Sequence, residues 1–156
     1  MRTIAHIKPR SSVKLPLRRI VLSGTCIRSP ALQELTLLTP ELRVLILDRC
    51  DLGISELIFS GLCHVKNPVY NQLDLDLSEC KLDAKVAELI AQYIPKVAHL
   101  TKISLTENAF KDKVVDIIQC LPKCPHLQHV ALGNKGKPNG SGFLKKLTEA
   151  LSLSEC

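Results

Sequence analysis

The hydrophobic positions along the chain follow a short pattern that recurs five times. The pattern is eleven residues long and reads L-x-x-L-x-L-x-x-N/C-x-L, where L stands for a large apolar side chain. Two copies, beginning at Leu42 and Leu100, match at every position, and two weaker copies begin at Leu17 and Gln72. A degenerate fifth copy begins at Leu127 and has lysine at the ninth and eleventh positions. Successive ninth positions are 25 to 30 residues apart, and chance rarely places five copies at so nearly constant a spacing.

Positions 4 and 6 of the pattern indicate β-strands. Apolar residues at alternate positions leave the same face of an extended chain, so each copy predicts a short strand with this face buried. The ninth residue turns the chain inward, where a buried asparagine bonds to the backbone of the neighbouring copy. Cysteine fits the same place, and it stands there as Cys50 and Cys80. These two cysteines therefore have an expected structural role without a disulfide.

Segments with helical spacing follow the strands. Residues 82–93 have apolar side chains at i, i+4, i+7, i+8 and i+11, namely Leu82, Val86, Leu89, Ile90 and Tyr93. They predict a helix with Asp83 in its first turn. Residues 114–121 repeat this spacing, and residues 55–65 predict another helix with Ser55 as a plausible N-cap. The segment from Pro30 to Leu38 is short and predicts a single helical or 3₁₀ turn.

A strand followed by a helical return, repeated at this spacing, resembles the leucine-rich-repeat superfamily, nearest the ribonuclease-inhibitor-like class. The resemblance covers roughly residues 17–150. It implies an α/β fold, a right-handed solenoid of about five repeats with parallel strands on the concave face and helices on the convex face. Residues 1–16 would form a basic N-terminal arm or cap, and residues 17–156 the repeat domain. Its repeats would start near 17, 42, 72, 100 and 127.

The C-terminal segment permits two interpretations. Phe143, Leu147 and Leu151 have helical spacing and predict a C-terminal helix over residues 143–153. Residues 151–156 read L-S-L-S-E-C and mirror Leu75 to Cys80, which would instead make them a truncated sixth strand.

Composition and charge narrow the class of protein. With 156 residues, 46% of them apolar and 23% charged, the chain is expected to be one folded soluble domain. It contains no apolar run of roughly 20 residues and no secretory segment at its start. Residues 1–33 hold seven basic residues and no acidic residue, whereas the rest of the chain holds 14 basic and 15 acidic residues. The excess positive charge is therefore one basic end on a near-neutral body.

The seven cysteines favour a reducing compartment. Their number is odd, and without a signal peptide we expect them to be mostly reduced and buried. The predicted localisation is cytoplasmic, with mitochondrial targeting or delivery into a host cell as alternatives.

The resemblance also implies which residues face a partner, because positions 3, 5, 7 and 8 point outward on the concave side. An apolar patch on the first two copies would be rimmed by Arg18, Arg19, Arg43 and Arg49, beside an acidic centre. Such a patch ringed by charge is typical of a protein-binding site. The predicted protein-binding residues are Arg19, Val21, Val44, Ile46, Asp48, Arg49, Asp74, Asp76, Glu79, Lys102 and Glu107.

Three clusters contain residue types that can form chemical sites. Asp74 and Asp76 could be an acid and a base, although carboxylates on an open strand are more often solvated. Cys120, Cys124, His126 and His129 are residue types that bind zinc, but they lack the two separated pairs of ligands that are usual in zinc sites. Cys63 and His64 are helix neighbours, whose side chains do not face each other.

The sequence therefore predicts no enzyme. No phosphate-binding loop, dinucleotide fingerprint or hydrolase motif is present, so we expect no catalytic residue, metal or cofactor. The leading hypothesis is a non-catalytic interaction module that binds a protein through its concave face, as an adaptor, regulatory subunit or bacterial effector. The alternative is that the basic N-terminal segment binds anionic lipid or RNA, or acts as a targeting segment. No small-molecule substrate is expected.

Overall fold

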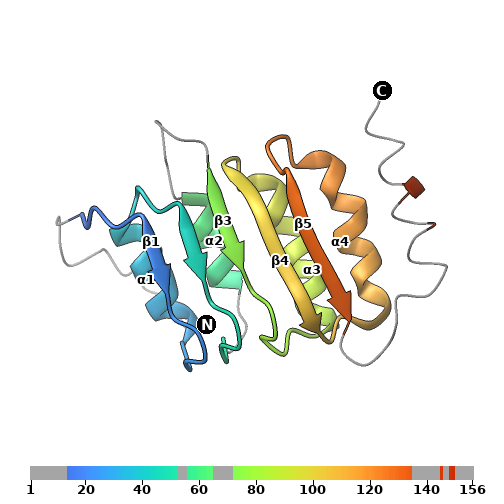
Figure 1. Ribbon diagram of the computed structural model, residues 1–156, viewed down its shortest axis with the longest axis horizontal. Helices are drawn as coiled ribbons and strands as arrows, with labels where there is room; N and C mark the ends of the chain where they lie inside the picture. Colours follow the sequence, from blue (N-terminus) through green and yellow to red (C-terminus); the bar gives the residue numbers. More distant parts are fainter. Residues whose placement is uncertain (1–13, 53–55, 65–71, 135–144, 146–147, 150–156) are drawn as a thin grey trace, which may run out of the picture.

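The computed structural model of the chain describes residues 14–52, 56–64, 72–134, 145 and 148–149. Within them, five strands form one sheet in chain order, and each strand pairs in parallel with the next (Figure 1). The strands are β1 (Arg19–Val21), β2 (Val44–Ile46), β3 (Leu73–Asp76), β4 (Leu100–Asn108) and β5 (His129–Asn134). The predicted α/β class is confirmed.

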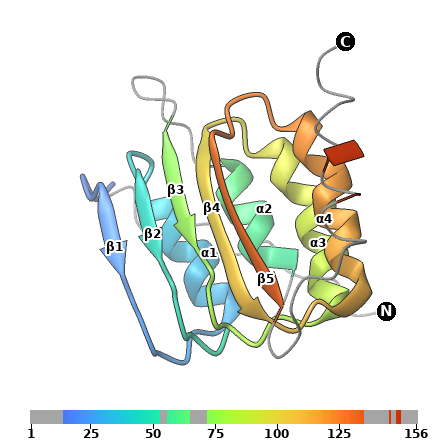
Figure 2. The same ribbon diagram turned by 45° about the vertical axis from the view of Figure 1, so that its right-hand side comes forward.

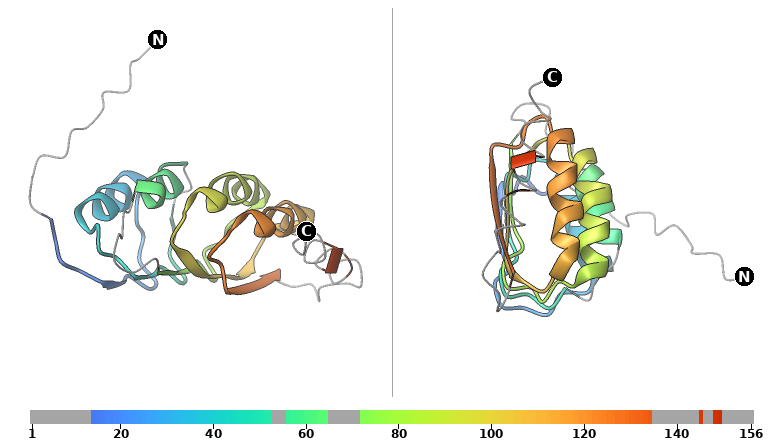
Figure 3. Two further views of the ribbon diagram at one scale, coloured as in Figure 1. Left: turned by 90° about the horizontal axis from the view of Figure 1, so that it is seen from above. Right: turned by 90° about the vertical axis from the view of Figure 1, so that its right-hand side faces the viewer.

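Helices connect consecutive strands. They are α1 (Ser29–Leu38), α2 (Glu56–His64), α3 (Ala84–Tyr93) and α4 (Val114–Cys120). Short 3₁₀ turns follow α3 (Ile94–Lys96), precede α4 (Lys111–Lys113) and follow it (Leu121–Lys123). The four helices lie in one layer on the same face of the sheet, so the described helices leave its other face open (Figures 2 and 3). In the described part of the chain, no helix has both the length and the apolar character needed to cross a membrane.

The hydrophobic core lies between the sheet and the helix layer, and the pattern predicts its members. In the copies beginning at Leu42 and Leu100, the side chains at positions 1, 4, 6, 9 and 11 are all buried. They are Leu42, Leu45, Leu47, Cys50 and Leu52 in one copy and Leu100, Ile103, Leu105, Asn108 and Phe110 in the other. The amphipathic helices complete this core through residues such as Val86, Ile90 and Ile117.

The ninth residue of each central copy ties that copy to the preceding one. Its side chain donates a hydrogen bond to the main-chain carbonyl at position 6 of the copy before it. The pairs are Cys50 to Leu22 (2.8 Å), Cys80 to Leu47 (2.9 Å) and Asn108 to Leu77 (2.9 Å). The predicted role of the N/C position is confirmed, and the six cysteines within the described residues are free thiols.

Position 8 has a backbone conformation that the pattern does not reveal. Gly24, Arg49, Glu79 and Glu107 all have φ between 56° and 68°, in the left-handed region that favours glycine. The amides of the first three donate to the position-7 carbonyl of the next copy, for example Glu79 to Thr106 at 3.0 Å. These bonds hold arginine and glutamate in a conformation that costs roughly 1–2 kcal/mol for a residue with a Cβ atom.

The helix after β1 is longer than the sequence predicted. Instead of a single turn, residues 29–38 form the ten-residue helix α1. Pro30 stands in its first turn, where the missing N–H costs no hydrogen bond, and no further proline or glycine interrupts it. Leu32 and Thr36 share a buried face, so tertiary packing extends the turn into a helix.

Two further positions differ from the pattern. Gln72 is exposed, and Leu73 takes the buried place opposite Leu100, with a register shift after it. The first apolar position of this copy is therefore displaced by one residue rather than lost. Asp83 is not in the first turn of α3 but is its N-cap, where its carboxylate accepts hydrogen bonds from the Lys85 and Val86 amides at 2.9 and 3.2 Å.

The first and last copies bury less than the pattern predicted. Leu17 at position 1 is 44% exposed, and Val130 at position 4 is 39% exposed. Leu17 precedes the edge strand β1, and Val130 lies in the edge strand β5; among the described residues, each of these strands has a neighbouring strand on one side only. The apolar positions of a copy are therefore all buried only where that copy lies between two others.

The chain ends are described in part. Two hydrogen bonds join residues 14 and 15 to the end of α1. The Leu15 amide donates to the Leu38 carbonyl at 2.7 Å, and the Lys14 ammonium group donates to the Leu37 carbonyl at 3.1 Å. Residues 1–13, which make up most of the predicted basic arm, lie outside the described residues, as does Ser55. In the predicted C-terminal helix the described residues 145 and 148–149 are helical. The alternative sixth strand at 151–156 lies outside the described residues.

Candidate functional site

Parallel pairing in register brings the predicted outward positions into two rows on the open face of the sheet. The position-3 row is Arg19, Val44, Asp74, Lys102 and His129. The position-5 row is Val21, Ile46, Asp76, Ser104 and Ala131. Residues that are 25 to 30 apart in the chain thus stand side by side, about 4.8 Å apart between strands.

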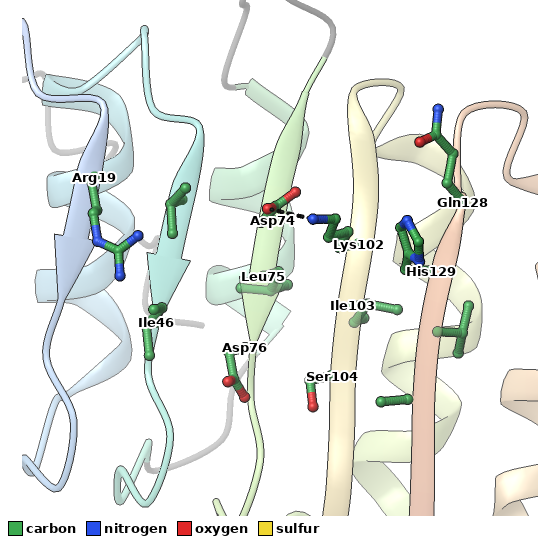
Figure 4. Close-up of a pocket in the computed structure, with 13 residues that line it drawn as sticks. Arg19, Ile46, Asp74, Leu75, Asp76, Lys102, Ile103, Ser104, Gln128 and His129 are labelled. Carbon is green, nitrogen blue, oxygen red and sulfur yellow. Dashed lines mark ion pairs between the residues drawn. The ribbon is translucent and has the colours of Figure 1, made fainter.

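A groove with a volume of about 670 Å³ lies over these rows (Figure 4). Six of the predicted binding residues line it: Arg19, Val44, Ile46, Asp74, Asp76 and Lys102. The rest of the lining is Leu75, Ile103, Ser104, Gln128, His129, Val130 and Ala131. The groove therefore extends from β1 to β5, beyond the first copies on which the sequence prediction concentrated.

The other predicted residues are not part of the groove lining. Val21 is 50% exposed at the edge strand β1. The other four, Asp48, Arg49, Glu79 and Glu107, stand at positions 7 and 8 of their copies, after the position-5 row along the chain, and do not line the groove. The predicted acidic centre is thus divided, because only Asp74 and Asp76 belong to the groove.

Asp48 makes a local charge cluster of its own. The Ser23 hydroxyl donates a hydrogen bond to its carboxylate, and the Arg49 Nε donates another at 2.9 Å. The Ser23 hydrogen bond, followed by the Arg49 contact, lowers the pKa of Asp48 below its ordinary value. Asp48 therefore stays ionised and is already paired within the described part of the chain.

The two groove carboxylates differ in their partners. Asp74 accepts a hydrogen bond from the Thr101 hydroxyl at 3.1 Å and forms an ion pair with Lys102 at 3.5 Å (Figure 4). Asp76 accepts hydrogen bonds from the Ser78 amide at 2.9 Å and the Ser78 hydroxyl at 2.6 Å. Among the described residues, no cation pairs with Asp76 and no carboxylate pairs with Arg19. The groove thus presents one acidic and one basic side chain without an internal counter-charge.

Apart from Lys102, the groove residues on β4 and β5 are absent from the predicted site. Ser104, His129 and Ala131 occupy positions 3 and 5 of their copies, as the predicted residues do. The outward positions of the pattern already place them on this face, but the predicted set contains only charged and branched aliphatic residues.

The candidate zinc ligands are not gathered around one point. The Cys124 thiol donates toward the Cys120 carbonyl at 3.5 Å, and His126 and His129 are exposed. Within the described ranges, no group of three or more histidine, cysteine or acidic residues could hold a metal ion. Cys63, the other reactive candidate, has its pKa raised by burial, which disfavours its nucleophilic thiolate form.

Cys124 is expected to be alkylated by iodoacetamide before Cys120 in the folded protein. A hydrogen bond from the Cys120 thiol stabilises the Cys124 thiolate and lowers the pKa of Cys124, whereas the same bond and burial raise the pKa of Cys120. Because the thiolate reacts, the rate at Cys124 should rise with pH at a lower midpoint than at an ordinary thiol. Peptide mapping by mass spectrometry measures both sites. Cys120→Ala should move the Cys124 midpoint upward; equal rates at the two thiols would contradict the assignment.

Comparison with known proteins gives one partial similarity. A 94-residue stretch is 32% identical to the capping protein, Arp2/3 and myosin-I linker protein 2 of Mus musculus, and the match covers 58% of this chain. The chain spans about 7% of the length of that relative. No model of a known protein family matches the chain.

Proposed function

We propose that the chain is a leucine-rich-repeat module of the ribonuclease-inhibitor-like class, with the open face of the sheet as the concave face of a right-handed solenoid. Three observations support this class. The pattern recurs at a near-constant spacing, its strands pair in parallel in chain order, and its ninth residues bond to the preceding copy. Each copy buries its apolar face against the next, which is how repeat proteins are stabilised.

The module binds a protein partner through this face and carries out no catalysis. The observation that carries this function is the groove of about 670 Å³ lined by Val44, Ile46 and charged side chains from several strands. An apolar floor with charged neighbours is the surface expected of a protein-binding site. The groove carboxylate Asp74 supports a binding role over acid–base chemistry, because it is engaged in an ion pair with Lys102.

The partial relative supports the same function. Its name describes a linker of capping protein, Arp2/3 and myosin-I. An adaptor or regulatory role in the cytoplasm is consistent with such a relative, and delivery into a host cell as an effector would use the same binding face. The matched stretch is a small part of that relative, so its partners are not transferred to this chain.

The double substitution Val44→Asp/Ile46→Asp tests the binding face. It places two carboxylates on the groove floor, and we expect partner capture from the native cell extract to fall at least tenfold, because each charge must be desolvated against an apolar surface. Affinity capture with quantitative mass spectrometry measures the loss. Circular dichroism and the melting temperature establish that the variant folds.

A matched control adds the same charge elsewhere. Gln92→Asp/Gln119→Asp introduces two carboxylates at exposed positions of α3 and α4, on the helix side of the sheet. Capture should then be unchanged. If the folded groove variant captures the same proteins at the same level as the wild type, the open face is not the binding site.

A further inference from the structure

Asp76 is the acidic side chain of the groove that remains available to a partner. It is half-buried on β3, between Ile46 of β2 and Ser104 of β4 in the register of the sheet. Ser78 holds one of its carboxylate oxygens through two hydrogen bonds, which fixes the orientation of the group. The neighbouring Asp74 has Lys102 as its cation, whereas Asp76 has none within the described residues. A held carboxylate without a counter-ion is prepared to accept a cation at little cost in side-chain entropy.

Arg19 supplies the opposite charge on the other side of an apolar floor. Its side chain is exposed and reaches from β1 toward β2 (Figure 4). Val44 and Ile46 of β2 lie between Arg19 and β3, and both are half-buried on the groove side. The groove thus combines a cationic side chain, an aliphatic floor and a carboxylate along one diagonal.

The sheet geometry sets the spacing of these three features. Arg19 and Asp76 are two strands and two residues apart, which places their Cα atoms about 12 Å from each other. An extended peptide covers this distance in three to four residues, at about 3.3 Å per residue. Asp74 and Lys102 neutralise each other, so this diagonal carries the charge of the groove that a partner can match.

We propose that the groove binds an extended peptide segment with a lysine or arginine at Asp76, an aliphatic side chain on Val44 and Ile46, and a carboxylate at Arg19. The cationic and acidic residues of this segment stand four positions apart, with the aliphatic residue midway between them, because alternate side chains of an extended chain share one face. This assignment rests on the proposed binding function and adds to it the chemistry of the partner. Complementary charges at the two ends fix both the position and the direction of the bound segment.

Selection from a library of random twelve-residue peptides displayed on phage tests the assignment on the full chain. We expect the selected peptides to share an aliphatic residue flanked by a basic residue and an acidic residue. Synthetic copies of the best peptide should bind about tenfold more weakly to Asp76→Asn, which keeps the shape of the side chain and removes its charge. Added salt should weaken binding to the wild type more than binding to this variant.

Two further variants make the test specific. Glu34→Gln removes a carboxylate from an exposed position of α1, on the helix side of the sheet, and should leave the affinity unchanged. Asp76→Lys should reject the selected peptide but regain binding when the basic residue of the peptide is changed to glutamate. This exchange requires direct contact between the two side chains, because a general loss of structure would not be rescued by the peptide.

The outcomes separate this assignment from the proposed function. Peptides that lose binding with Ile46→Asp but keep full affinity for Asp76→Asn overturn the assignment and leave the groove as a binding site. A selection that yields no peptide dependent on Ile46 also overturns the assignment. The binding face itself is then judged by capture of the native partner with the Val44→Asp/Ile46→Asp variant.

Discussion

Replacing Asn108 with alanine is expected to lower the free energy of unfolding by about 3 kcal/mol, because it leaves several buried backbone groups without hydrogen bonds. The side chain is fully buried, and its Nδ2 donates to the carbonyls of Leu77 at 2.9 Å and Leu105 at 3.1 Å. Its Oδ1 accepts a hydrogen bond from the Leu82 amide at 3.1 Å. Two of these bonds join the copy that contains β4 to the preceding copy, so their loss weakens the contact between repeats.

Urea denaturation followed by circular dichroism measures this change. Asn108→Cys is the matched control, since Cys50 and Cys80 occupy the same position in their copies. Each donates to the position-6 carbonyl of the preceding copy, as Asn108 does to Leu77. Cysteine should keep that one bond and recover about 1 kcal/mol of the loss. If alanine costs less than about 0.5 kcal/mol, the ninth position does not join the copies energetically.

Replacing Phe110 with alanine is expected to cost roughly 3–5 kcal/mol, since it leaves a cavity in the core between sheet and helices. Phe110 is fully buried and occupies the eleventh position, where Leu52 and Leu82 stand in the two preceding copies. Free energies of unfolding of 5–15 kcal/mol are typical of domains, so this single change removes a large share of the stability.

Phe110→Leu separates the volume of the side chain from the requirements of the position. Leucine is the residue that neighbouring copies use, and we expect a loss of about 1 kcal/mol. The same denaturation experiment measures both variants. Equal losses for leucine and alanine would show that the aromatic ring, and not an apolar side chain in general, is required at this position.

Much of the fold could be predicted because the same residue spacing recurs in each copy, so each copy supports the interpretation of the others. Alternating leucines predicted which side chains leave each face of the strands, and the buried positions agree in the two complete copies. The ninth position predicted a backbone contact for Cys50 and Cys80, and both make it. These features depend on local spacing, which a sequence states directly.

Other features could not be predicted because they depend on neighbouring copies. The length of α1 depends on packing of its buried face, and Leu73 replaces Gln72 in the core through a register shift with β4. The left-handed conformation of Arg49 and Glu79 has no signal in those residue types, which disfavour it. Hydrogen bonds to the next copy hold these residues in that conformation.

The sequence by itself determined the outward rows of the candidate site, since a period of two places positions 3 and 5 of each copy on the same face. Only the tertiary structure decided which charges in those rows are already paired. Asp74 finds Lys102 on the adjacent strand, whereas Asp76 is held by Ser78 and keeps its charge available. The reason is physical: spacing along the chain selects a face, but ion pairing depends on distances between strands that only the assembled sheet sets.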